Sequence, residues 1–258
     1  MVTTAGSGHV AGALGMADVF SALYFYLLRH RPKDPFWDER DRLILSCGHI
    51  CPILYASLEL SGYFAKEKLT TLRQLGSGLA GHPVKEKLPG VEYSSGSLGQ
   101  GVSFAVGLAL AAKIDGKAWR TVCVTSDGEQ QEGQVWEAYL LAAKYKLDNL
   151  VFILDRNNIQ IDGHVDEVMP CDPLRQKYES FGLFVLEVDG HNIEDVIDVY
   201  LKAMVLHSRP TMIIAHTIPG KGVEFMQNSP LWHRKAPSTE EGEEALRQLR
   251  VLDKKALI

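Results

Sequence analysis

The sequence has few features that would tie the chain to a membrane or a nucleic acid. The net charge is −5, and the only tight basic group is RHRPK at 29–33, so little is available to neutralise nucleic-acid phosphates. The longest apolar stretch, GVSFAVGLALAAKI at 101–114, is too short to span a bilayer. The first residues, MVTTAGSGHV, lack the apolar core of a secretory signal. We therefore expect a cytoplasmic protein with neither a membrane nor a nucleic acid as partner.

Cysteine is also scarce. The four cysteines are Cys47, Cys51, Cys123 and Cys171, and their positions do not have zinc-finger spacing. A chain of 258 residues can build a core without disulfides. The sequence therefore predicts free thiols in a reducing compartment.

Apolar strands alternate with helical patterns along most of the chain. The predicted strands are 43–46, 121–125, 150–154, 183–188 and 210–216, and the predicted helices are 11–28, 52–61, 66–75, 102–113, 133–145, 193–206 and one that opens at Ser238 with Glu241 as its capping-box partner. This alternation predicts an α/β fold, with a mostly parallel sheet and helices on both faces. No linker or repeat divides the chain, so we expect one domain over 1–258.

An acid and an amide follow two successive strands, where a parallel sheet binds its ligands. Asp127 lies in TSDGEQQEG and Asn157 in LDRNNIQIDG, 157 − 127 = 30 residues later. Carboxylate, amide and carbonyl oxygens suit Mg²⁺ or Ca²⁺, and the carbonyl of Ile159 could supply a third ligand. Gly128 allows a phosphate to approach the backbone. Helix capping by Asp127 and a turn at Asn157 would explain the same residues, and spacing alone leaves both interpretations open.

Five of the nine histidines follow a glycine: His9, His49, His82, His164 and His191. None shows the i, i+4 pairing of a helical zinc site. Taken one at a time, they are typical of turns and surfaces.

A set of short motifs nevertheless resembles the transketolase family. The motifs are GSGHVAG (6–12), SCGHICPILYASL (46–58), GHP (81–83), SSGSLGQG (94–101), SDGEQQEG (126–133), LDRNNIQIDG (154–163), DGHN (189–192) and GKGVEF…WH (220–233), in transketolase order. They cover essentially the whole chain. The chain is similar to the pyrophosphate-binding domain, the N-terminal third of a full transketolase.

The resemblance implies a thiamine diphosphate site. Asp127, Asn157 and the carbonyl of Ile159 would hold Mg²⁺ (or Ca²⁺) against the cofactor diphosphate. The other cofactor contacts would come from His49, Gly96, Leu98, Gly128, Ile161 and His233, with Leu98 and Ile161 against the cofactor rings. Glu132 matches a glutamate of the family's subunit interface.

The resemblance also gives the histidines a role. His9, His49, His82 and His233 match positions around the reacting carbon and the sugar hydroxyls, with His49 and His82 nearest that carbon. The reaction develops an alkoxide and needs a base of near-neutral pKa, and imidazole can donate, accept and bind hydroxyls without a permanent charge. His191 matches a family motif too, and a loop role explains it equally well.

No part of the sequence resembles the pyrimidine-binding domain, whose glutamate activates the cofactor in this family. The chain therefore resembles the N-terminal subunit of a split transketolase, which moves a two-carbon unit from a ketose phosphate to an aldose phosphate. We expect it to be inactive without a separate C-terminal subunit that carries this glutamate. Because the cofactor would lie between subunits, we expect an α2β2 heterotetramer.

Four positions depart from the family pattern, and they leave the substrate open. They are Val10, Cys47, Ser126 and Arg234. A guanidinium at Arg234 could pair with an anionic substrate group or be an exposed loop residue. Two alternatives therefore remain: a related thiamine diphosphate enzyme subunit for an unusual sugar phosphate, and a noncatalytic scaffold subunit. A Rossmann-type nucleotide site is rejected, because no G-x-G-x-x-G follows a strand.

Overall fold

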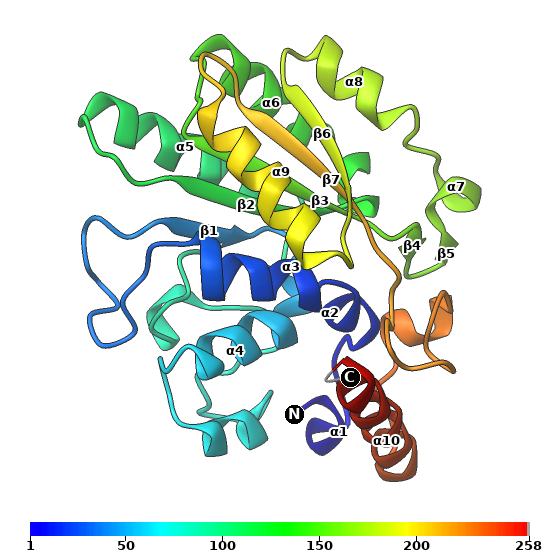
Figure 1. Cartoon of the computed structure of the whole chain (residues 1–258). Coiled ribbons are helices and arrows are strands. Elements are labelled where there is room, and N and C mark those ends of the chain that lie inside the picture. Colours follow the sequence, from blue (N-terminus) through cyan, green and yellow to red (C-terminus); the bar gives the residue numbers. More distant parts are fainter. Residues whose placement is uncertain (257–258) are drawn as a thin grey trace.

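A five-stranded parallel sheet forms the centre of the computed structural model, which describes residues 1–256 and the side chains of 1–251 (Figure 1). The strand order is β1 (Arg42–Leu45), β2 (Thr121–Ser126), β3 (Leu150–Arg156), β7 (Thr211–His216) and β6 (Phe184–Asp189). All neighbouring pairs are parallel. The predicted strands and the α/β class are confirmed, and each strand begins or ends within two residues of its predicted limits.

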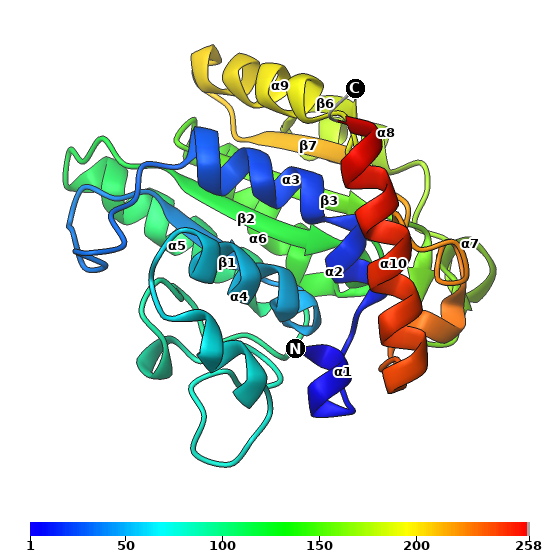
Figure 2. The same ribbon diagram turned by 60° about the horizontal axis from the view of Figure 1, so that its bottom comes forward.

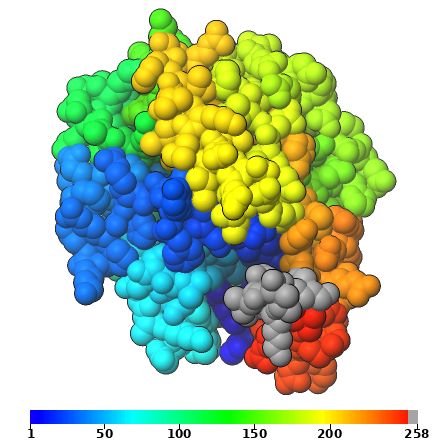
Figure 3. Space-filling model, viewed as in Figure 1, coloured from blue at the N-terminus to red at the C-terminus, as the bar shows by residue number. Residues whose placement is uncertain are grey.

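Helices cover both faces of the sheet, as predicted. One face carries α3 (Ala17–Ala22), α4 (Cys51–Leu60) and α9 (Ile193–Val205), and the other carries α5 (Gln100–Ile114), α6 (Gly133–Lys144) and α8 (Leu174–Ser180). Successive strand residues point to opposite faces of the sheet. In β2, Val122 and Val124 pack in the core under α3, α4 and α9, and Cys123 packs in the core under α5, α6 and α8. α9 packs on β6 and β7, and Figure 3 shows it at the surface with the blue N-terminal segments beside it.

The N-terminal helical pattern is not one continuous helix. It divides into α2 (Ala11–Gly15), α3 and a π-helical turn at Leu23–Leu27, with a break at Met16. A Cβ at Gly15 would approach the carbonyl oxygen of Ile218 to 3.1 Å, so this break lies where another loop passes closely. The preceding short helix α1 (Val2–Ala5) lies beside the last helix, α10 (Thr239–Ala256), as Figure 2 shows.

The prediction of a helix at 66–75 is wrong. Only a 3-10 helix forms, over Lys66–Thr71, and Arg73 has a left-handed backbone with φ of 61°. A left-handed residue stops a right-handed helix, and here it begins the long loop that leads to α5. The predicted capping box at Ser238 is confirmed: the Ser238 amide donates to Glu241 Oε2 at 2.9 Å, and the Glu241 amide to Ser238 Oγ at 3.2 Å.

The remaining elements are short, and most of them follow a strand along the chain. They are the 3-10 helices Gly48–Ile50, Lys85–Lys87, Gly128–Gln131 and Pro230–His233, the helix α7 (Val165–Val168), and the antiparallel pair β4 (Ile159–Gln160) and β5 (Gly163–His164). No helix in the described part of the chain is long and apolar enough to cross a membrane. The four cysteines are free thiols, as predicted, and all four are buried.

Candidate functional site

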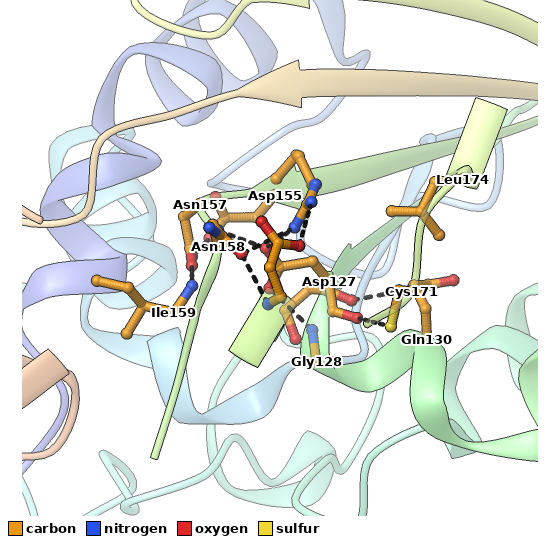
Figure 4. Close-up of polar contacts among 12 residues, drawn as sticks. Asp127, Gly128, Gln130, Asp155, Asn157, Asn158, Ile159, Cys171 and Leu174 are labelled. Atoms are coloured by element: carbon orange, nitrogen blue, oxygen red, sulfur yellow. Dashed lines mark hydrogen bonds and ion pairs between the residues drawn. The ribbon is translucent and has the colours of Figure 1, made fainter. Parts of the chain in front are cut away.

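Asp127 follows β2 directly and is completely buried. Its Oδ1 accepts a hydrogen bond from the Gly128 amide at 2.8 Å, and its Oδ2 accepts one from the Asn158 amide at 2.5 Å. Arg156 Nη1 also donates to Oδ2, at 3.2 Å. Figure 4 shows these contacts at the ends of β2 and β3. The backbone of two neighbouring strands therefore fixes the position of this carboxylate.

Asn157 follows β3, and its amide is held at both ends. Its Nδ2 donates to Asp155 Oδ2 at 2.8 Å, and its Oδ1 accepts from the Ile159 amide at 2.9 Å. The Asn157 oxygen and Asp127 Oδ1 each accept one hydrogen bond, so each retains a lone pair for a cation. The Asn158–Asp127 bond links the two strand tips, so the structure brings the three predicted metal ligands into one small region of the sheet edge.

The donor set fits a hard divalent cation that shares a phosphate ligand. Within the described residues, no group of three or more His, Cys, Asp or Glu side chains could hold a metal ion. An ion at this edge would therefore need amide or carbonyl oxygens, and further ligands from a bound molecule. Magnesium commonly combines one or two carboxylates with substrate phosphates in this way. The residues present are thus compatible with a metal-bound diphosphate.

Burial raises the pKa of Asp127, while hydrogen bonds from Asn158 and Gly128 and the charge of Arg156 oppose this rise. Burial raises the pKa of Asp155 to about 7, and the neighbouring Asp127 acts in the same direction. Two acids this close together resist ionising at the same time. A divalent cation bound here would favour the ionised form of both.

Four of the predicted histidines meet in one cavity of about 430 Å³ beside the strand tips. The ring centroids of His9 and His49 are 5.2 Å apart, those of His9 and His233 are 5.6 Å apart, and those of His49 and His233 are 5.3 Å apart. Nine predicted residues line this cavity: His9, His49, His82, His233, Gly96, Leu98, Gly128, Ile159 and Ile161. Asp127 and Asn157 are not among the lining residues.

The histidines come from separate segments. His49 lies in the 3-10 helix after β1, His9 lies before α2, and His233 ends the 3-10 helix Pro230–His233. His82 belongs to the long loop, and its ring is about van der Waals distance from a Cβ placed at Gly96. The chain thus collects these rings from segments up to 233 − 9 = 224 residues apart.

The imidazoles are held in their neutral form. Burial, and then the neighbouring histidines, lower the pKa of His49 to about 3. Burial lowers the pKa of His9 to about 4, with His233, Arg73 and His82 acting in the same direction. Burial also lowers the pKa of His82 and of His233. His9 Nδ1 is buried without a hydrogen-bond partner in the described part of the chain, as expected where a polar ligand would supply one.

Glu129, which sequence reasoning missed, joins three loops of the site. It is completely buried, and its Oε1 accepts from the Ser46 hydroxyl at 2.5 Å and from the Gly99 amide at 2.6 Å. Its Oε2 accepts from the Ser126 amide at 3.2 Å. Burial raises its pKa, and these three hydrogen bonds oppose the rise. Its place after β2 was the only sequence signal, since two of the partners lie 30 and 83 residues away.

Arg73 was also missed, because the predicted helix covered it. Its Nη1 donates to Ser7 Oγ at 2.7 Å, and its charge lowers the pKa of both His9 and His82. A fixed guanidinium therefore lies beside the histidine cluster. An anionic group of a bound substrate could pair with it.

His191 has a structural position. Its Nδ1 lies 3.0 Å from Asp18 Oδ2, and its Nε2 accepts from the Ile218 amide at 2.7 Å. It therefore ties the loop after β6 to α3 and to the segment that leads to His233, and it does not line the cavity. Glu132 is exposed at the cavity edge, and its interface role stays a prediction.

The four departures have different surroundings. Cys47 is buried with its thiol directed to the Val124 carbonyl oxygen at 3.7 Å. Ser126 is buried, and Val10 is half-buried against the core. Arg234 is exposed, and its charge contributes to the lowered pKa of His233.

Comparison with known proteins agrees with this arrangement. A family model described as the thiamine diphosphate binding domain of transketolase matches residues 1–255. An apulose-4-phosphate transketolase subunit from Phocaeicola vulgatus is 41% identical over 249 residues, which cover 96% of this chain and 88% of that protein. The 6-deoxy-6-sulfo-D-fructose transketolase subunit of a Clostridium species is 42% identical over 228 residues, covering 88% of this chain and 83% of that protein.

Solved structures give the same result. The crystal structure of transketolase from Campylobacter jejuni superposes with a TM-score of 0.91 at 39% identity, over 96% of this chain and 40% of that one. This chain also spans 37% of human transketolase, at 39% identity. It therefore belongs to the transketolase family, of which it forms the thiamine diphosphate binding, N-terminal part.

Proposed function

We propose that this chain is the cofactor-binding subunit of a two-subunit transketolase, which moves a two-carbon ketol unit from a ketose phosphate to an aldose phosphate. The observation that carries the proposal is the cavity lined by nine predicted site residues next to the Asp127–Asn157 strand tips. A noncatalytic scaffold would need neither this convergence nor four neutral imidazoles. The domain proposed for this role is the single pyrophosphate-binding domain over 1–258.

In this proposal the strand tips hold the cofactor. Asp127, Asn157 and the carbonyl of Ile159 bind Mg²⁺ or Ca²⁺, and Gly128 contacts the diphosphate through its backbone. Leu98 and Ile161, which line the cavity, contact the rings of the cofactor in this proposal. When bound, thiamine diphosphate supplies the electron sink for the two-carbon unit. Gly96, His49 and His233 complete the contacts to the cofactor.

In this proposal the histidines transfer protons and bind hydroxyl groups. A neutral imidazole at His49 or His82 can donate a hydrogen bond to an alkoxide that develops on the substrate, and it can take a proton from a sugar hydroxyl. His9 and His233 assist with the sugar hydroxyls and with the diphosphate side of the cofactor. The low pKa of His9 and of His49 keeps both rings uncharged at neutral pH, so that they can accept as well as donate.

A partner subunit would complete the site. Three relatives named as transketolase subunits match most of this chain and most of their own length. Phe104, Leu140 and Leu141 are exposed apolar residues on α5 and α6, and Gln100 Nε2 joins these two helices by donating to Gln134 Oε1 at 2.7 Å. These exposed apolar side chains suit contact with a C-terminal subunit that carries the pyrimidine-binding domain and the activating glutamate, within an α2β2 assembly.

The substrate in this proposal is a sugar phosphate. Two relatives are named for unusual sugars, apulose-4-phosphate and 6-deoxy-6-sulfo-D-fructose. Arg73 beside the histidines and the exposed Arg234 after His233 offer positive charge for an anionic sugar. These relatives favour an uncommon donor or acceptor over the common pentose phosphates, and a screen of ketose and aldose phosphates distinguishes them.

Calorimetric titration tests the proposal. Thiamine diphosphate and Mg²⁺ are titrated into this chain alone and into its mixture with the C-terminal subunit, with Asp127→Ala as control. We expect binding that requires Mg²⁺, tightens with the partner and is lost in Asp127→Ala. We also expect ketol transfer only in the mixture. Absence of cofactor binding in the mixture would contradict the proposal and leave the scaffold alternative.

A further inference from the structure

Behind Asn157 lie a buried acid and a buried hydroxyl that do not line the cavity. Asp155, in β3, is only 1% exposed. Its Oδ1 accepts a hydrogen bond from the Thr217 hydroxyl, and its Oδ2 accepts one from Asn157 Nδ2 at 2.8 Å. Thr217 follows β7 and is also buried. Each oxygen of the Asp155 carboxylate therefore has one defined donor.

These contacts decide which end of the Asn157 amide is available to a ligand. An amide presents either an oxygen or an NH₂ group, and only the oxygen can bind a cation. Because Asp155 takes the NH₂ group, the amide oxygen points the other way, where the Ile159 amide donates to it. Figure 4 shows Asp155, Asn157 and Asp127 grouped at the end of β3. The second lone pair of this oxygen remains for a metal ion.

Thr217 holds the Asp155 carboxylate, which in turn holds the Asn157 amide. β3 and β7 are neighbours with Arg156 opposite His216, and the Thr217 amide donates to the Arg156 carbonyl at 3.3 Å. The Thr217 hydroxyl therefore reaches Asp155 from a position set by the sheet. In this way the end of β7 sets the orientation of a side chain on the loop after β3.

The charges around Asp155 also indicate a cation nearby. Arg156 pairs with Asp127, Asp166 and Asp172, but in the described part of the chain no basic side chain pairs with Asp155. A buried carboxylate without a cationic partner costs free energy. A dication bound by Asn157, one side chain away, would offset that cost.

We propose that Asp155 and Thr217 are positioning residues, which hold the Asn157 amide with its oxygen toward the divalent cation. The inference rests on the proposed metal-diphosphate function of the strand tips. It adds two residues that touch neither the cofactor nor the ion. Partners of this kind commonly change metal affinity about 10- to 100-fold.

The test measures Mn²⁺ affinity by electron paramagnetic resonance, on the full chain in complex with its C-terminal subunit, at saturating thiamine diphosphate. Thr217→Val removes the hydroxyl at nearly constant shape, and Thr217→Ser keeps it. We expect Thr217→Val to weaken Mn²⁺ binding about 10-fold or more and Thr217→Ser to stay within about threefold of the wild type. Equal affinity in Thr217→Val and the wild type would overturn the role of Thr217.

Exchanging the acid and the amide between positions 155 and 157 distinguishes positioning of the Asn157 oxygen from a general effect on folding. Asp155→Asn leaves one acceptor oxygen for two donors, the Asn157 NH₂ group and the Thr217 hydroxyl, so it should weaken Mn²⁺ binding about 10- to 100-fold. The double substitution Asp155→Asn/Asn157→Asp exchanges donor and acceptor and again directs an oxygen to the ion. We expect it to recover affinity to within about threefold of the wild type. A double variant no better than Asp155→Asn would overturn the inference.

The outcomes also distinguish the inference from the proposed function. If the wild-type complex binds no Mn²⁺ in the presence of thiamine diphosphate, the proposed function fails. If the wild type binds Mn²⁺ and Asp127→Ala does not, while Thr217→Val and Asp155→Asn bind normally, only the positioning inference fails. Circular dichroism and urea unfolding of each variant show that it is folded under the conditions of the measurement.

Discussion

The oxygen ligands at the strand tips and the four histidines of the cavity come from different kinds of structure. Asp127 and Asn157 follow neighbouring strands. The Asn158 amide holds Asp127, and Asp155 and the Ile159 amide hold Asn157. The histidines come from loops and 3-10 helices scattered over most of the chain. The strand tips therefore have a position set by the sheet, whereas the histidine cluster depends on how several loops pack together. Cofactor binding and the rate of the chemical step should therefore respond to different substitutions.

The largest effect is expected on the chemical step. His82→Ala should lower kcat about 10²- to 10⁴-fold with the partner subunit present, since a positioned acid–base group contributes a factor of this size. Cofactor affinity should change little, because His82 belongs to the long loop and makes no contact with Asp127 or Asn157. Steady-state kinetics and calorimetry on the same preparation check both values. Unchanged turnover would remove His82 from the mechanism.

At the strand tips, we expect a substitution to change cofactor affinity. Asn157→Ala removes a ligand, so it should lower the affinity for thiamine diphosphate with Mg²⁺ by more than about 100-fold, the upper range for substitution of an outer partner. Calorimetry as a function of Mg²⁺ measures this loss. Asn149→Ala is a matched control, because this amide lies at the other end of β3 and donates to the Ala109 carbonyl. Equal affinity in Asn157→Ala and the wild type would show that Asn157 binds no metal.

Glu129 connects the two parts of the site, and its replacement should affect stability. In Glu129→Gln, an NH₂ group would face either the Ser126 amide or the Gly99 amide, so one buried donor loses its acceptor. This should lower the free energy of unfolding by about 1–3 kcal/mol. Urea unfolding measures it. Glu86→Gln, an exposed residue in the long loop, should leave the unfolding midpoint unchanged. Equal midpoints for both variants would contradict the connecting role.

The smallest effect is spectroscopic. Because the pKa values of His9 and His49 are lowered to about 4 and about 3, their ring signals should not shift between about pH 5.5 and about pH 8. The unfolded chain takes up these protons near pH 6.5, so these two histidines make folding less favourable as the pH falls from there toward 4. Heteronuclear NMR of histidine-labelled protein checks the titration. A midpoint of about 6.5 for either ring would show that it is exposed to solvent.

The sequence by itself determined the alternation of strands and helices, because strand and helix each impose a period on the apolar residues. It also determined the two strand tips, since a parallel sheet places successive carboxyl ends at one edge. The structure confirms all five strands and the capping box at Ser238. The ordered motifs, compared with a known family, added the four histidines. The pattern of apolar residues alone did not single them out.

Only the tertiary structure decided how the loops close around the site. In place of the predicted helix at 66–75, a 3-10 helix ends at Thr71, and Arg73 has a left-handed backbone and contacts Ser7, a contact that no local pattern shows. The burial of Glu129 depends on Ser46 and Gly99, which are distant along the chain. The orientation of Asn157 depends on Asp155 and, through it, on Thr217 at the end of another strand. Periodicity reports which face of an element is buried, but a hydrogen bond between distant segments exists only once the sheet has brought them together.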